Sequence, residues 1–269
     1  MKPLATILFF CIAAAAQAQT DSPFVLRKRI PVQAVDVAVD NLNNIYLLTA
    51  GDQLKKFYPS GDSAAVYNDV RRFGKLWSID VTNPLKPLLF YKDFATVVYL
   101  DRFLAPKNVV DLRQQNIVQP SAAAIAYDNN MWVYDALDFK LKKVADDGRL
   151  MTETADFRTL FGQDFLPEKI VDVNNSVYLF DRRRGVWQFD YYGTLQKKHP
   201  VGDWRSLSIT DRMLMGTDDK GLVLYNPVNL MQRQYQFPSS FGSFNRYFVA
   251  NTQLFALSKD SLSVYSLPR

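Results

Sequence analysis

A short pattern of residues recurs along the chain and restricts the folds that it can adopt. Each copy has an Asn-Asn pair, an aromatic-rich apolar run, a second short run and a closing glycine. The clearest copies are residues 43–61, 129–148 and 174–193. Short apolar runs between Asn, Asp and Gly are typical of β-strands that are joined by tight turns. The sequence therefore predicts successive β-hairpins, and it contains no amphipathic helix of useful length.

The repeat has a period of about forty residues, which defines the architecture. The turn between the first two strands of each unit falls near residues 40, 83, 128, 174, 211 and 251. Six units with this period and about four short strands each are typical of a β-propeller. We therefore predict an all-β fold, a six-bladed β-propeller, as a single domain over residues 19–269.

The two ends of the chain complement each other. The last unit, about residues 244–267, supplies only three strands, whereas residues 24–32 form a strand candidate with no unit of their own. Because a closed ring leaves fewer unpaired sheet edges, we predict that residues 24–32 supply the outer strand of the last blade. The alternative is a disordered N-terminal segment.

The N-terminus has the features of a secretion signal. Lys2 precedes an apolar run over residues 4–16, and Ala16-Gln17-Ala18 fits the rule for a cleavage site. We predict a signal peptide over residues 1–18 and export to the periplasm or the cell surface, in association with the outer membrane. The alternatives are a retained membrane anchor or lipidation of Cys11. No later apolar run has the length of a transmembrane helix.

Cysteine content and charge limit the partners. Cys11 is the only cysteine and would leave with the signal peptide, so we expect no disulfides. The net charge is +5 before cleavage, which suits acidic partners or an anionic lipid surface. The expected export disfavours nucleic acid as a partner.

The units resemble the NHL-type repeats of six-bladed propellers. The resemblance rests on Asn175, the strand 177–179, Asp181, Phe189-Asp190 and Gly193. It implies the propeller fold but no single activity, because NHL-like propellers include scaffolds, ligand binders and enzymes. As a whole, the chain is also similar to small exported propellers of bacteria with type IX protein secretion.

Residues for catalysis or metal binding are sparse. His199 is the only histidine, whereas a zinc site in a propeller needs several imidazoles, and no G-x-S-x-G motif is present. We therefore expect neither a metal site nor another cofactor. Asp40, Asp128 and Asp211 end the first strands of their units and leave open a calcium site, although such residues commonly cap turns. An enzyme, a lyase or hydrolase that uses carboxylates and calcium at the channel mouth, is the alternative.

The departures from the repeat indicate a possible docking face. In a propeller, the turn between the second and third strands and the link to the next blade open on one face. The candidate partner-binding residues on that face are Arg71, Arg72, Arg182, Arg183, Arg184, Trp204, Phe241 and Phe244. Phe161 and Phe165, from the long link after the third unit, belong to the same face.

Arginines beside exposed aromatic rings are typical of interaction hot spots. The alternatives are aromatic rings that pack between blades and an arginine triplet that is only solvated. We predict a non-catalytic module that binds a protein partner in the cell envelope, for example as an accessory subunit of an outer-membrane assembly or a protein-secretion complex. A carbohydrate binder that uses Trp and Tyr rings is a further alternative.

Overall fold

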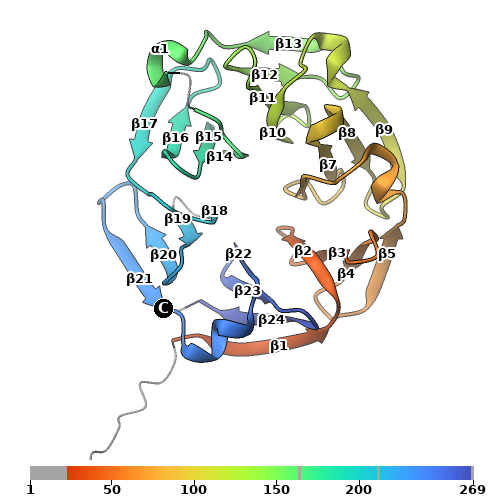
Figure 1. The fold of residues 1–269 in the computed structure, drawn as a ribbon, viewed down its shortest axis with the longest axis vertical. Helices are drawn as coiled ribbons and strands as arrows, with labels where there is room; N and C mark the ends of the chain where they lie inside the picture. Colours follow the sequence, from red (N-terminus) through yellow and green to blue (C-terminus); the bar gives the residue numbers. More distant parts are fainter. Residues whose placement is uncertain (1–22, 163–164, 211–212, 268–269) are drawn as a thin grey trace, which may run out of the picture.

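The computed structural model is a ring of six four-stranded antiparallel sheets around a central axis (Figure 1). It describes residues 23–162, 165–210 and 213–267. The predicted signal peptide and Asp211 lie outside the described residues. Each sheet forms one blade, so the predicted six-bladed β-propeller is confirmed.

The first three blades follow one another in sequence order. Blade 1 contains β2 (Ala34–Val39), β3 (Ile45–Thr49), β4 (Leu54–Phe57) and β5 (Ser63–Tyr67). Blade 2 contains β6 (Ser78–Asp80), β7 (Leu88–Tyr91), β8 (Thr96–Leu100) and β9 (Pro106–Asp111). Blade 3 contains β10 (Pro120–Ile125), β11 (Met131–Asp135), β12 (Lys140–Val144) and β13 (Leu150–Glu153).

The second half of the ring repeats this order until the last blade. Blade 4 contains β14 (Lys169–Val173), β15 (Ser176–Asp181), β16 (Gly185–Phe189) and β17 (Leu195–His199). Blade 5 contains β18 (Ser206–Thr210), β19 (Met213–Thr217), β20 (Gly221–Tyr225) and β21 (Gln232–Gln236). Blade 6 contains β22 (Arg246–Ala250), β23 (Gln253–Leu257), β24 (Ser261–Ser266) and β1 (Val25–Pro31).

Blade 6 combines strands from both ends of the chain. β1 pairs antiparallel with β24, with Ile30 opposite Leu262 (Figure 1). Ile30 is buried and belongs to an apolar cluster with Leu262 and Val264, which also includes Val37 of blade 1. The same strand therefore completes one blade and packs that blade against the next.

The repeated residues occupy the turns. Asn43, Asn129 and Asn174 have φ angles of 62°, 67° and 53°. Asparagine tolerates this left-handed region better than most residues, because its short side chain bonds to the local backbone. The recurring Asn-Asn pair is thus required by the turn conformation.

The helices of the described ranges are all short. Those in the links between blades are η1 (Val70–Phe73), η3 (Leu112–Gln115), α1 (Arg158–Phe161) and η4 (Ser239–Ser243). A further one, η2 (Lys92–Phe94), lies in the turn between β7 and β8 of blade 2. None of the helices in the described ranges is long and apolar enough to cross a membrane. Phe161 and Phe165 from the link after blade 3 are buried against Trp187 and Phe189 of blade 4. These two rings therefore pack between blades 3 and 4.

We predict that Ile30→Ala lowers the free energy of unfolding by about 2–4 kcal/mol, because it leaves a cavity between blades 6 and 1. Leu26→Ala on the same strand is the matched control. Leu26 is 48% exposed, so its loss should cost less than about 1 kcal/mol. Equilibrium denaturation in urea measures both values. Equal small losses in the two variants would contradict a stabilising role for β1.

Candidate functional site

The ring has two different faces. One face, here called the linker face, carries the turns between second and third strands and the links between blades. The opposite face, here called the hairpin face, carries the remaining turns. All eight partner-binding candidates come from segments of the linker face. The inner strands β2, β6, β10, β14, β18 and β22 surround the channel that joins the two faces.

Arg71 and Arg72 lie on η1 at the edge of the linker face. Both side chains are exposed. Arg71 forms an ion pair with Asp52, and the guanidinium of Arg72 lies 5.4 Å from the centroid of the Phe73 ring. The exposed edges of both guanidinium groups remain accessible from solvent.

The arginine triplet occupies the turn between β15 and β16. The carboxylate of Asp181 is buried and accepts hydrogen bonds from the backbone N–H groups of Arg183 at 2.8 Å and Leu166 at 2.8 Å. Arg184 is half-buried and donates from its guanidinium to the carbonyl oxygen of Phe161 at 3.0 Å. Arg182 and Arg183 are exposed, so two of the three side chains project from a backbone that is held in place.

The three predicted aromatic contacts lie largely inside the molecule. Trp204 is 2% exposed and packs between blades 4 and 5, where a methyl group on Gly216 would lie 2.1 Å from its ring. Phe241 is 3% exposed and packs against Phe24 and Tyr265. Phe244 is half-buried against Phe241. For these rings, packing between blades is the alternative that matches the structure.

The carboxylates considered for calcium have other partners. Asp40 is buried and accepts hydrogen bonds from the backbone N–H groups of Leu42 and Asn44 and from the hydroxyl of Tyr46. Burial, followed by the charge of Asp40, raises the pKa of Tyr46. Asp128 pairs with Lys143 at 2.7 Å. Within the described ranges, no three His, Cys, Asp or Glu side chains come together in a metal-binding arrangement.

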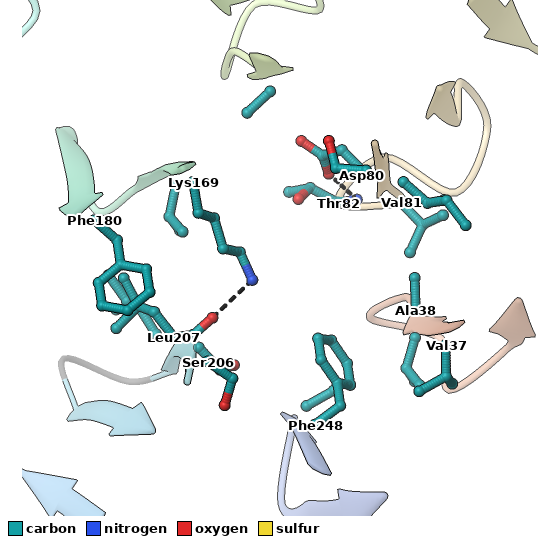
Figure 2. Close-up of a pocket in the computed structure, with 18 of the residues that line it drawn as sticks. Val37, Ala38, Asp80, Val81, Thr82, Lys169, Phe180, Ser206, Leu207 and Phe248 are labelled. Carbon is teal, nitrogen blue, oxygen red and sulfur yellow. Dashed lines mark hydrogen bonds between the residues drawn. The ribbon is translucent and has the colours of Figure 1, made fainter. Parts of the chain in front are cut away.

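The central channel contains a cavity of about 700 Å³ that all six blades line. Its walls combine apolar and polar side chains. Val37, Val81, Phe180, Leu207 and Phe248 are among the apolar ones, and Asp80, Thr82, Lys169 and Ser206 are among the polar ones (Figure 2). At the linker face, the cavity meets charged side chains of the surrounding loops. These are Glu168, Arg182, Arg205 and Arg246.

The side chain of Lys169 extends into this cavity (Figure 2). It is the first residue of β14, and its Nζ donates to the carbonyl oxygen of Leu207 at 2.7 Å. Nζ also lies 5.6 Å from the centroid of the Phe248 ring. Burial lowers the pKa of Lys169, and the carboxylates of Asp80 and Asp36 offset this effect only in part.

Neither of these carboxylates forms an ion pair with Lys169. Asp36 pairs with Arg246 at 2.7 Å. Asp80 accepts hydrogen bonds from the backbone N–H groups of Thr82 and Ile125, both at 2.8 Å. The two acids therefore stabilise the inner strands, and the ammonium in the channel has no carboxylate partner in the described part of the chain.

An aromatic side chain marks the channel mouth at the linker face. Trp77 is 41% exposed, and the ammonium of Lys92 lies 4.4 Å from the centroid of its ring. Burial raises the pKa of Glu168. The nearby positive charges of Arg182 and Lys92 oppose this effect. Trp77, Lys92, Glu168 and Arg182 thus form a charged and aromatic rim, here called the mouth rim.

Of the residues at the mouth and in the channel, Arg182 was among those predicted from the sequence, whereas Trp77 and Lys169 were not. Trp77 lies in the run of residues 76–81, which reads as an ordinary strand of the second unit. Lys169 is the only lysine in the six inner strands, which are apolar or small at most positions. A lysine among apolar and small residues could have indicated a functional side chain, but this contrast is visible only once the inner strands are known.

His199 lies away from the channel, on the outer strand β17. It is fully buried between Tyr178 and Tyr225, and its Nε2 lies 3.2 Å from the side-chain oxygen of Gln188. Burial, together with the charge of Lys197, lowers the pKa of His199 to about 4. The histidine therefore packs between blades 4 and 5 as a neutral ring.

Comparisons with known proteins support the fold alone. No protein-family profile matches the chain, and no curated protein matches it. Virginiamycin B lyase from Staphylococcus aureus has a TM-score of 0.63 at 10% identity, over 91% of this chain and 99% of that one. The Pan2 WD40 domain of Neurospora crassa has a TM-score of 0.59 at 10% identity, over 93% and 97%. BBS1N in complex with ARL6DN has a TM-score of 0.57 at 11% identity, over 92% and 98%.

We predict that His199 makes folding sensitive to acid. Its pKa is below the unfolded value of 6.5, so the unfolded state binds the proton more tightly. The stabilisation is complete above pH 6.5 and is lost as the pH falls toward 4, by up to about 3 kcal/mol. Urea denaturation of the wild type and of His199→Gln, between pH 7.5 and 5, measures this loss. If the free energy of unfolding falls equally with pH in both proteins, the loss of stability does not come from His199.

Proposed function

We propose that this propeller is an interaction module that docks a protein partner on its linker face. The observation that carries the proposal is the turn between β15 and β16, where Arg182 and Arg183 are exposed while Asp181 holds the backbone. A loop backbone that is held before binding loses less conformational entropy in the complex. Such a turn can therefore contribute affinity as well as charge.

The surroundings of the turn support the same interpretation. Arg182 belongs to the mouth rim, in which Trp77 is 41% exposed. Arg and Trp are enriched among the residues that dominate binding energy at protein interfaces. Arg71 and Arg72 extend the basic surface on the same face.

The chemistry of the arginines indicates the class of partner. Guanidinium groups bind carboxylates through two parallel hydrogen bonds. We therefore infer a partner segment that contains Asp or Glu side chains and an apolar group for Trp77. Trp204 and Phe241 are not part of this proposed contact, because both rings are buried.

The cellular context remains that of the sequence analysis. Residues 1–18 have the pattern of a signal peptide, which supports export to the periplasm or the cell surface. The module would then act in the cell envelope, as an accessory subunit of an outer-membrane assembly or a protein-secretion complex. Among structures with the same fold, BBS1N was solved in complex with ARL6DN, which agrees with a propeller that holds a protein partner.

We predict that Arg182→Ala/Arg183→Ala reduces the recovery of the specific partner by at least about tenfold, because two exposed guanidinium groups are lost from the interface. The measurement is affinity purification of the tagged protein from its native cell envelope, followed by quantitative mass spectrometry. Thermal unfolding should change little, since both side chains are exposed.

The matched control is Arg27→Ala/Arg233→Ala. It removes the same charge from the exposed outer strands β1 and β21. The control should retain the partner that the linker-face variant loses. If both variants recover every partner at the wild-type level, the proposed docking face is wrong.

A further inference from the structure

We propose that the central channel binds a small organic anion, a carboxylate with an apolar body, through the ammonium group of Lys169. This site lies inside the ring and does not depend on the partner proposed for the linker face. Its volume of about 700 Å³ is within the range of about 300–1,000 Å³ that is typical of pockets for small molecules.

The first argument is the hydrogen bonding of Lys169. An ammonium group has three N–H donors, and one donates to the carbonyl oxygen of Leu207. Figure 2 shows Nζ directed toward this oxygen at the edge of the cavity. The remaining donors have no protein acceptor in the described part of the chain. A carboxylate in the cavity could accept from them.

The second argument is charge balance. A cation in an apolar environment is costly unless an opposite charge neutralises it. Lys142 of blade 3 illustrates the usual solution in this protein, since Asp135 at 2.8 Å and Asp138 at 2.6 Å neutralise its buried ammonium. Lys169 has no such pair, because Asp36 binds Arg246, and Asp80 binds backbone N–H groups and acts on Lys169 only through its charge at longer range. A bound carboxylate would supply the direct ion pair that Lys169 lacks.

The third argument is the shape and character of the walls. Leu207 and the ring of Phe248 lie beside the ammonium of Lys169, whereas Val37 and Val81 line the opposite side of the cavity (Figure 2). Such walls favour an apolar or aromatic body next to the anionic group. Arg182 at the linker-face mouth would attract an anion toward the entrance.

Anion binding should be coupled to the protonation of Lys169. Burial favours the neutral amine, whereas a bound carboxylate favours the ammonium form. Affinity should therefore fall as the pH rises through the pKa of Lys169. The charged groups that line the cavity with it are Asp36 on β2, Asp40 after β2, Asp80 on β6, Asp172 on β14 and Arg246 on β22, with Glu168, Arg182 and Arg205 at the mouth.

The test uses phenylacetate as the anionic probe and phenylacetamide as its neutral counterpart, with isothermal titration calorimetry on the full mature chain. We expect phenylacetate to bind the wild type and Lys169→Met to weaken this binding at least tenfold. Phenylacetamide should bind weakly and equally to both proteins. Lys198→Met removes an exposed lysine from β17 and should bind phenylacetate like the wild type.

A second measurement uses only the wild type, so that it remains informative if Lys169→Met does not fold. Acetic anhydride modifies the exposed amine of each lysine, and peptide mass spectrometry follows the rate at Lys169. Phenylacetate should slow this rate, while phenylacetamide should leave it unchanged. Equal rates with both probes, or equal affinity of Lys169→Met and wild type for phenylacetate, would overturn the proposal.

Discussion

Each blade of this protein can bury its two faces only against its neighbours, so the hydrogen-bonded pairing of β1 with β24 supports the whole ring. The apolar clusters lie between successive blades, and one of them joins blade 6 to blade 1 through Ile30, Val37 and Leu262. An open ring would expose the apolar faces of the first and last blades to water. Every feature of the channel depends on this closure, because all six inner strands contribute to its wall.

The sequence predicted the parts of the structure that local chemistry determines. Asn43, Asn129 and Asn174 adopt left-handed turn conformations, so a recurring Asn-Asn pair directly reports the position of a turn. The period of these turns then gives the number of blades. The link aromatics could not be assigned in this way, because the burial of Trp204 and Phe241 depends on residues of the neighbouring blades.

The candidate site could be predicted only in part, for a related reason. Arg182 and Arg183 interrupt a repeat and were therefore visible in the sequence. The ammonium group of Lys169 contacts Leu207 and Phe248, which lie on two other blades. Only the closed ring brings these three residues together. A single chain pattern contains no information about such a convergence, although the lysine itself stands out among the residues of the inner strands.

The burial of His199 has a consequence for the surface of the protein. Histidine is the side chain whose usual pKa lies closest to neutral pH, and this chain has only one, fully enclosed between two tyrosines. The arginines of the linker face keep their charge throughout the range from about pH 6 to pH 8. The positive charge that these arginines present is therefore independent of His199, and association through them would respond to salt.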